Sequence, residues 1–294
     1  MRVFMTGASG WIGSAVTAEL LAHGHAVVGL ARSDASAEKV AALGVSVHRG
    51  DIHDPSTLAS GVEQADGVIH LAFDHTFSDM EGAARVDRIV IEALGEMLAG
   101  SGRPLLIASG VAGLPSGRVA TERDQPDPAT HPRAGTAIST VDLAARDVRS
   151  AVVRFAPTVH GAGDHGFIGT LVDIARKRGV SGYVGDGTNR WPAVHIRDAA
   201  QLVRLALESA PPGSVVHAVA EEGIATRDIA EALARGLGLP ARSIAPDEAP
   251  AHFGWMARVF ASDLPTANAI TRERFGWTPT HPTVLEDIAA GHYF

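Results

Sequence analysis

Short apolar runs alternate with longer amphipathic stretches over the first half of the chain. The apolar runs predict β-strands, which lie at residues 3–5, 26–31, 45–48, 67–73, 104–109 and 150–155. Helical spacing of apolar residues predicts helices between them, at residues 14–22, 35–43, 83–98 and 137–145. Strands that alternate with helices in this way form a parallel sheet with right-handed crossovers, so the pattern predicts an α/β fold with a doubly wound sheet.

The pattern changes after Pro157. Residues 157–169 and 179–192 are rich in glycine, and long glycine-rich connections in a compact protein usually line a binding site. We therefore expect a core over residues 1–157 and a mixed region over 158–294, in which residues 193–220 return to the core sheet.

Capping residues mark the helices of this second region. We expect Thr226 to cap a helix over residues 226–235 that Gly236 ends, and Thr283 with Glu286 to form a capping box on the last helix. Further elements are predicted at residues 198–210, a helix, and 215–220, a strand.

Composition narrows the functional classes. The net charge is −8 and no basic tail is present, so nucleic acid and anionic membranes are unexpected partners. The chain has no cysteine, which excludes thiol catalysis, disulfides and cysteine-ligated zinc. It starts directly with a strand and has no apolar run of membrane-spanning length, so we expect a cytoplasmic protein. His160, Asp164 and His165 form the one cluster of metal-binding residue types, without a known ligand spacing, and we expect no metal.

Glycines at three-residue spacing follow the first strand. Gly7, Gly10 and Gly13 lie between that strand and a helix, where unpaired backbone N–H groups and the positive end of the helix dipole can bind a pyrophosphate. An ordinary strand–helix turn is the alternative, but the context favours a dinucleotide site of the Rossmann type. Ser9, Trp11 and Ile12 fall in the same turn and are expected to contact the cofactor.

The end of the second strand indicates which dinucleotide is bound. Arg32 and Ser33 stand where an NADP site places groups that bind a 2′-phosphate, and Asp34 lies one step further out. We therefore favour NADP(H) over NAD, with a solvated Arg32 as the alternative. Asp51 is expected to accept from the adenine amino group, with Ile52 under the ring. The polar loop of residues 74–79 carries His75, which we interpret as a loop residue.

Several motifs in order resemble the extended and atypical short-chain dehydrogenase/reductases. They lie at residues 6–13, 50–52, 68–72, 153–161 and 194–200. The resemblance implies about seven parallel strands in the order 3-2-1-4-5-6-7, a small C-terminal substrate lobe and an NAD(P)H cofactor. It further implies that Leu71, Ala72 and Phe73 line the cofactor, and that Pro157, Thr158 and Val159 lie near the nicotinamide amide.

The catalytic residues of that superfamily are not all present. Its Tyr-x-x-x-Lys pair would fall near Arg133 and Ala137, and the two tyrosines of this chain, Tyr183 and Tyr293, lie elsewhere. A serine, Ser109, ends the fifth strand beside the expected nicotinamide, and Asp87 stands where the family usually carries an asparagine. Both are expected to contact the cofactor. The pattern resembles an atypical subgroup with a degenerate active site.

Ser109 and Arg133 are the expected catalytic groups, because they can polarise a carbonyl or imine while the nicotinamide supplies hydride. The proton source stays open among His160, His165, Asp164, water and Tyr183, the last as a lid residue. The sequence favours an NADPH-dependent oxidoreductase of a small, fairly apolar carbonyl, imine or enone, acting as a monomer or homodimer. The alternatives are a non-catalytic NADP-binding redox sensor and, more weakly, a nucleotide-sugar epimerase or dehydratase.

Overall fold

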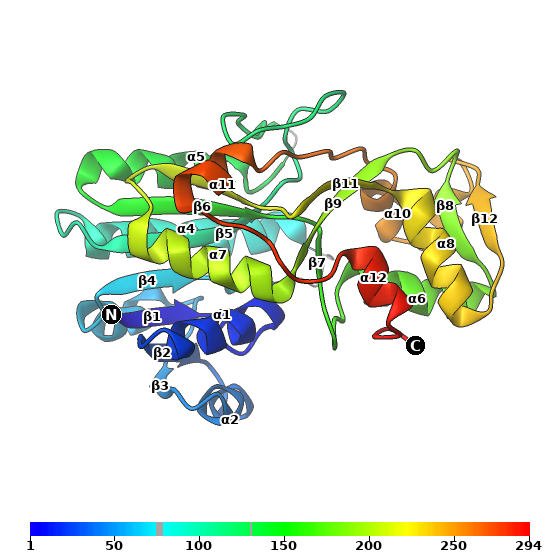
Figure 1. Cartoon of the computed structure of the whole chain (residues 1–294). Helices are drawn as coiled ribbons and strands as arrows, with labels where there is room; N and C mark the ends of the chain where they lie inside the picture. The colour runs from blue at the N-terminus through cyan, green and yellow to red at the C-terminus, as the bar shows by residue number, and fades with distance from the viewer. Residues whose placement is uncertain (75–78, 130) are drawn as a thin grey trace.

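A twisted parallel sheet forms the centre of the protein (Figure 1). The structure is a computed structural model that describes residues 1–74, 79–129 and 131–294, so His75 lies outside the described part. The sheet has the strand order β10-β6-β5-β4-β1-β2-β3, which confirms the predicted order with β10 as the seventh strand. Its members are β1 (Arg2–Thr6), β2 (Ala26–Ala31), β3 (Ser46–Arg49), β4 (Gly67–His70), β5 (Pro104–Gly110), β6 (Arg149–Phe155) and β10 (Ser214–Ala218).

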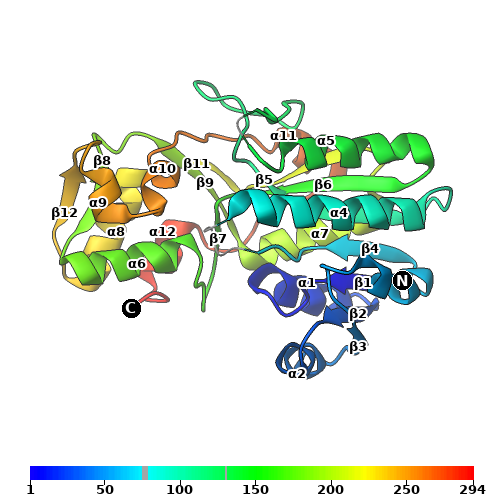
Figure 2. The same ribbon diagram turned by 180° about the vertical axis from the view of Figure 1, so that it is seen from behind.

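Helices cover both faces of this sheet (Figures 1 and 2). One face carries α1 (Trp11–Ala22), α2 (Asp34–Ala42) and α7 (Ile196–Ser209). The other carries η1 (Pro55–Leu58), α3 (Ala59–Glu63), α4 (Met80–Leu98), α5 (Ala134–Asp142) and η2 (Leu143–Arg146). Side chains of a strand alternate between faces, so Val3 and Met5 enter the first core while Phe4 enters the second.

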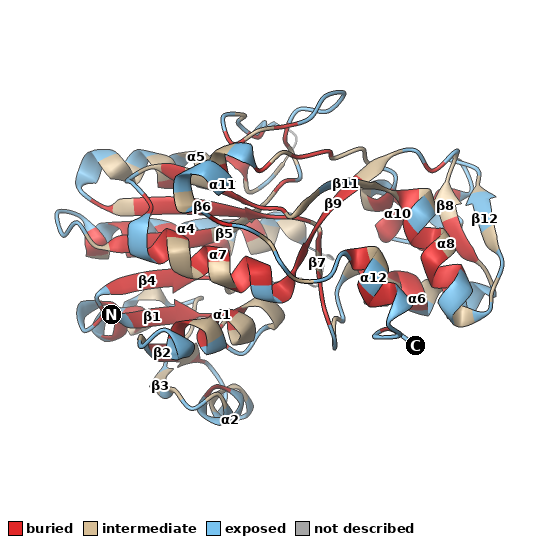
Figure 3. Cartoon of the chain, viewed as in Figure 1, coloured by how far each residue is buried: buried red, intermediate tan, exposed pale blue. Residues whose placement is uncertain are grey.

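A second lobe packs beyond the carboxyl ends of the strands. Its elements are β7 (Thr158–His160), α6 (Phe167–Arg178), β8 (Ser181–Val184), β9 (Arg190–His195), β11 (Glu221–Ala225), α8 (Thr226–Leu237), β12 (Ala241–Ile244), α9 (Ala249–Phe253), α10 (Met256–Phe260) and α12 (Val284–Ala289). The lobe has an apolar core of its own around Trp191, Phe253 and Phe260. Buried residues accordingly fill the central sheet and the inward sides of the lobe helices (Figure 3). Helix α11 (Ala269–Phe275) returns to pack on α7.

The structure corrects two local expectations and confirms a third. Strand β4 ends at His70 rather than residue 73, because its partner β1 ends at Thr6 and the Ala72 N–H donates to the Thr6 hydroxyl instead of to a backbone carbonyl. Thr226 is the first residue of α8 and not its cap, because its hydroxyl donates to Asn189 Oδ1; the N-cap position is Ala225. The helix ends with Gly238 as its C-cap, not with Gly236. The Thr283–Glu286 capping box is confirmed on α12. Among the described residues, no helix is both long and apolar enough to cross a membrane.

Candidate functional site

The turn between β1 and α1 depends on two glycines that leave no room for a side chain. Gly7 has φ +72°, and a Cβ there would lie 2.7 Å from the Ala72 nitrogen. A Cβ on Gly13 would lie 2.0 Å from the Gly7 carbonyl oxygen. A Cβ on Gly10 meets only that oxygen, at 3.3 Å, so the middle glycine is the open one. The first and third glycines thus shape the turn, and the second leaves its outer side free for a ligand.

The start of α1 offers unpaired donors. Gly10 is its N-cap and supplies no side-chain cap, and the first turn contains no acidic residue. Gly10 donates to the Gly7 carbonyl, while the N–H groups of Trp11, Ile12 and Gly13 have no backbone partner among the described residues. The indole of Trp11 donates to the Val159 carbonyl at 2.8 Å, which ties the turn to β7. Trp11 therefore anchors the turn, whether or not it also touches a ligand.

Strand β7 contains a buried hydroxyl, that of Thr158, without a hydrogen-bond partner among the described residues. Thr158 is 2% exposed, and its Oγ1 has no hydrogen-bond partner. A buried hydroxyl without a partner is costly unless a ligand or water fills the gap. Together with the free N–H groups at α1, this atom fits a dinucleotide laid along the strand ends, with its phosphates at the turn and its nicotinamide near Thr158.

The residues that the sequence predicts to bind the adenosine lie at the ends of β2 and β3. Arg32 is exposed there, and the Asp51 carboxylate accepts from the His53 N–H at 3.0 Å. That backbone bond holds the pKa of Asp51 below its ordinary value, with smaller contributions from the His53 side chain and from Arg32. The carboxylate therefore stays ionised and able to accept a further hydrogen bond.

Two residues at this end differ from expectation. The Ser33 hydroxyl accepts from the Ser36 N–H as the N-cap of α2 and donates its proton to Ser36 Oγ at 3.2 Å, so it is not a free phosphate donor. Arg49, which sequence reasoning missed, stands opposite Ala31 in the neighbouring strand and donates to the Ser33 carbonyl and to Asp34 Oδ1, both at 2.8 Å. The sequence signal that could have identified Arg49 is a basic residue at the end of the strand that pairs with β2.

Hydrogen bonds hold the guanidinium of Arg133 in one plane near the carboxyl end of β5. Its Nε donates to Asp87 Oδ2 at 3.0 Å, and its Nη2 donates to Asp87 Oδ1 at 3.2 Å and to the Ala108 carbonyl at 2.5 Å. Its Cζ lies 4.2 Å from the centre of the Phe73 ring. A guanidinium has five N–H donors. The bonds named here use three of them, and the two on Nη1 have no partner among the described residues.

Asp87 is a buried partner of Arg133. Its side chain is 1% exposed and also receives His70 Nε2 at 3.3 Å. His70 Nδ1 in turn lies 2.8 Å from Thr6 Oγ1. Both carboxylate oxygens of Asp87 thus accept hydrogen bonds within the protein, and its contact with the cofactor stays a prediction. His70 was missed, although a histidine inside an apolar strand was visible in the sequence.

Ser109 stands at the same edge as Arg133. It follows Ala108, whose carbonyl receives the guanidinium, and it is partly exposed at the end of β5. Its hydroxyl has no hydrogen-bond partner among the residues that the structure describes. Ser109 therefore follows directly on the residue whose carbonyl binds the Arg133 guanidinium, at the carboxyl end of β5.

The structure does not bring Tyr183 to this edge. It lies in β8, which pairs with β12 at the outer side of the lobe (Figure 1). The Arg227 guanidinium covers its ring at 5.3 Å. We therefore no longer assign Tyr183 a catalytic role.

The other proposed proton sources are largely engaged elsewhere. His160 is fully buried and its Nδ1 lies 2.6 Å from Asp287 Oδ2. Asp164 accepts from the Tyr293 hydroxyl at 2.9 Å, and burial raises the pKa of Asp164. His165 packs edge-on against Trp11, with ring centres 5.8 Å apart. None of these contacts points a proton donor at Ser109.

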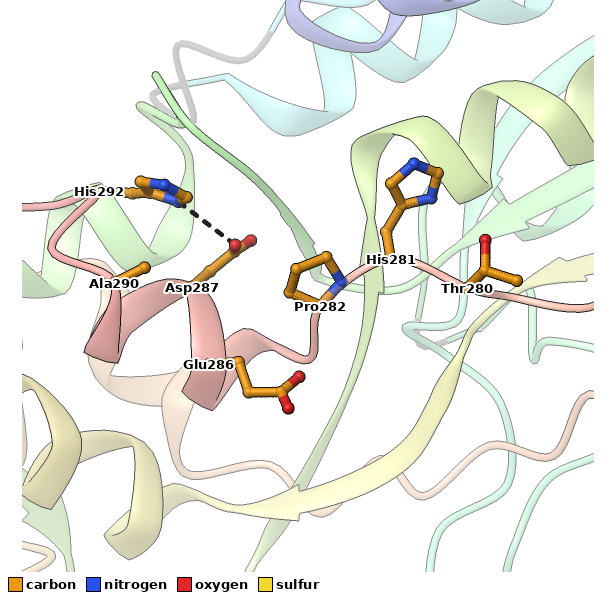
Figure 4. A pocket seen from close by; sticks show the side chains of 7 residues that line it. All are labelled: Thr280, His281, Pro282, Glu286, Asp287, Ala290 and His292. Atoms are coloured by element: carbon orange, nitrogen blue, oxygen red, sulfur yellow. Dashed lines mark ion pairs between the residues drawn. The ribbon is translucent and has the colours of Figure 1, made fainter.

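A separate hollow of about 500 Å³ lies beside α12, lined by Thr280, His281, Pro282, Glu286, Asp287, Ala290 and His292 (Figure 4). It is distinct from the strand ends, where the unpaired donors lie, so we place the candidate active site at the strand ends.

His195, Asp198 and His281, near this hollow, bring one ligand-type atom each within 4.8 Å of one another. The two imidazole rings are stacked 4.7 Å apart and only 7° from parallel, so their in-plane lone pairs cannot converge on one ion.

Comparison with known proteins gives this geometry a context. The model of the NAD dependent epimerase/dehydratase family matches residues 3–218. A protein of Schizosaccharomyces pombe described as uncharacterized is 46% identical over 295 residues, covering 100% of both chains. A Stigmatella aurantiaca protein named 4-hydroxy-2-methyl-3-oxo-4-farnesyl-3,4-dihydroquinoline-1-oxide ketoreductase is 29% identical over 73% of this chain and 67% of its own. A 2-alkyl-3-oxoalkanoate reductase of Stenotrophomonas maltophilia is 27% identical over 82% and 77%.

Solved structures share the fold at low identity. A dTDP-glucose 4,6-dehydratase of Streptomyces venezuelae with NAD bound has a TM-score of 0.78 and 20% identity, covering 99% of this chain and 96% of its own. A UDP-glucose 4-epimerase of Thermotoga maritima has a TM-score of 0.76 and 17% identity, covering 100% and 98%. At this level the likeness establishes the fold of the chain.

Proposed function

Because the chain belongs to the NAD dependent epimerase/dehydratase family, we propose that it is an NADPH-dependent oxidoreductase that reduces a small, largely apolar carbonyl, imine or enone. The observation that carries this proposal is the place of Arg133: its Nη2 donates to the carbonyl of Ala108, the residue before Ser109, while its Nη1 has no partner in the described part of the chain. The names of two distant relatives, a ketoreductase and an oxoalkanoate reductase, agree with carbonyl reduction.

The reaction needs a hydride, a proton and stabilisation of the charge that develops on oxygen. Reduced nicotinamide, when bound, supplies the hydride. Arg133 stays protonated and, with the Ser109 hydroxyl, donates hydrogen bonds to the carbonyl oxygen as negative charge grows there. The Ser109 proton then passes to the alkoxide and is replaced from water, so that carbonyl, hydride and proton give the alcohol.

Substitution of Ser109 tests this assignment. We expect Ser109→Ala to lower kcat about 30-fold against the best substrate from a panel of ketones, imines and enones, because one oxyanion donor and its proton are lost. The dissociation constant for NADPH, measured by fluorescence titration, should stay within about twofold, since Ser109 does not contact the phosphates. Ser139→Ala is the matched control, because Ser139 donates only to the Thr136 carbonyl of its own helix. Unchanged turnover in Ser109→Ala would reject the assignment.

A non-catalytic NADP-binding sensor is the second candidate. It is favoured by the placement of both tyrosines, since Tyr183 lies in β8 and Tyr293 is bonded to Asp164, leaving no tyrosine among the described residues of the strand ends. A sensor would bind NADPH in the same titration but oxidise none of it with any member of the panel. The two candidates are therefore separated by turnover alone.

A further inference from the structure

A buried row of polar side chains runs from β1 to Arg133. Thr6, His70 and Asp87 are 0%, 1% and 3% exposed. Their contacts are Thr6 Oγ1 to His70 Nδ1 at 2.8 Å, His70 Nε2 to Asp87 Oδ1 at 3.3 Å, and Asp87 Oδ2 to Arg133 Nε at 3.0 Å. Burying three such groups in an apolar sheet is costly unless each is satisfied.

With a neutral imidazole at His70, the donors and acceptors of this row fit together in one way that satisfies every contact. Thr6 Oγ1 accepts from the Ala72 N–H at 3.2 Å, so its own proton is available to His70 Nδ1. His70 is then the Nε2–H tautomer and donates to Asp87. Asp87 remains a carboxylate and accepts from Arg133 with both oxygens.

We propose that His70 is a positioning residue that acts through Asp87 to fix the plane of Arg133, and so the direction of its two free Nη1 donors. This inference rests on the proposed function for its kinetic consequence. An Asp87 carboxylate that lost the His70 donor could rotate about its own axis, and the bidentate guanidinium would rotate with it. Misplacing an oxyanion donor by about 1 Å costs on the order of 100-fold in rate.

The same row reaches the cofactor turn. The Ala72 N–H that donates to Thr6 Oγ1 is the group that excludes a Cβ from Gly7, at 2.7 Å. One hydroxyl therefore holds both the backbone behind the phosphate-binding turn and the histidine behind Arg133. We infer that the row sets the distance between the bound dinucleotide and the group that polarises the substrate.

Two polar substitutions of His70 test the proposal without changing its charge. The amide nitrogen of His70→Gln reaches the position of Nε2 and can donate to Asp87, whereas that of His70→Asn reaches only the position of Nδ1, beside Thr6. We expect kcat to fall about 30-fold in His70→Asn and no more than about threefold in His70→Gln, with KM for the carbonyl nearly unchanged in both. His217→Asn is the control for loss of a buried histidine, because His217 contacts Arg154 at the far edge of the sheet.

A double-mutant cycle tests whether the loss of kcat in His70→Asn acts through Arg133. In an Arg133→Ala background, His70→Asn should lower kcat by less than about twofold, because its target is gone. Equal losses in His70→Gln and His70→Asn, or full multiplication of the His70 and Arg133 effects, would overturn the proposal.

A second readout does not need turnover. The Arg133 Nε–H resonance, assigned by its loss in Arg133→Lys, should exchange slowly with solvent in the unmodified protein and in His70→Gln, and fast in His70→Asn. If no carbonyl is reduced but this pattern holds, the proposed function fails while the positioning role stands. If carbonyls are reduced and exchange is the same in all three proteins, the positioning role fails alone.

Discussion

The two sides of the candidate site are built by different means. At the cofactor turn, the residues that matter are Gly7, Gly10 and Gly13, which act through backbone groups and through the absence of side chains. At the proposed carbonyl side, Arg133 bonds to Asp87, which lies 46 positions away and in turn contacts His70 on a third element. A backbone site can be identified from a short stretch of sequence, whereas a side-chain site exists only after the fold has assembled its parts.

Disrupting the carbonyl side should have the largest effect on turnover and the smallest on cofactor binding. Arg133→Lys keeps the charge but loses the planar fork that fits both Asp87 oxygens. We expect kcat to fall about 1,000-fold, while the NADPH dissociation constant stays within about threefold. Steady-state kinetics and fluorescence titration measure the two quantities. Arg123→Lys, on an exposed loop, is the control. An equal loss of affinity and turnover would mean that the two sides are not separate.

Disrupting the turn should have its largest effect on cofactor binding. Gly7→Ala puts a side chain at φ +72° and 2.7 Å from the Ala72 nitrogen, so we expect the free energy of unfolding to fall by about 3 kcal/mol and NADPH binding to be lost. Gly44→Ala is a matched control, because Gly44 has φ +77° but nothing within 4 Å of a new Cβ. It should cost about 1 kcal/mol and leave NADPH binding intact. Equal costs at the two positions would remove the packing argument for Gly7.

The same contrast explains what could be read from the sequence. The parallel α/β pattern and the glycine turn followed from apolar periodicity and local spacing. The strand order was implied by the family resemblance, and the structure confirms it. The partner of Arg133 could not be read, because Asp87 is a helix residue whose carboxylate points at a loop end far along the chain. Tyr183 was misjudged for the same reason: its glycine-rich surroundings indicated a lid, but the pairing of β8 with β12 holds it in the outer lobe.

Cofactor selectivity depends on side chains, and its predicted effect is smaller. We expect Arg32→Ala to weaken NADPH binding by about 2 kcal/mol, the value of a hydrogen bond to a charged group, and to leave NADH binding nearly unchanged. Titration with both dinucleotides measures this. Arg49→Ala serves as the comparison, since Arg49 is already bonded to Asp34 and to the Ser33 carbonyl. Equal weakening of NADPH and NADH by Arg32→Ala would count against a 2′-phosphate contact.

Acid should destabilise the protein without acting on the turn, which has no titratable side chain between residues 7 and 13. Burial lowers the pKa of His217 to about 4, below the ordinary value near 6.5. Its folded-state pKa is depressed, so the stability it contributes is present above pH 6.5 and is lost as the pH falls toward 4.

Between pH 6.5 and about pH 5, the loss in the free energy of unfolding, measured with denaturant, should be about 2 kcal/mol. His217→Asn keeps a donor for the Ala267 carbonyl and removes the titration, so it should flatten this part of the pH profile. Identical profiles for the two proteins would assign the acid sensitivity to other groups, of which His195, whose pKa burial also lowers to about 4, is the next to test.

The smallest predicted effect concerns Ser33, where the sequence and the structure give different roles. The sequence indicated a donor to a 2′-phosphate, but the Ser33 hydroxyl accepts from the Ser36 N–H and forms a capping box at the start of α2. Ser33→Ala should therefore lower the free energy of unfolding by about 1 kcal/mol, as removal of an N-cap does, and leave the ratio of NADPH to NADH affinity unchanged. Ser33→Asp, which can still cap the helix, should retain the stability and weaken NADPH through repulsion of the phosphate. A change of more than about threefold in the affinity ratio for Ser33→Ala would return this hydroxyl to the cofactor site, and would mean that the cap opens when the dinucleotide binds.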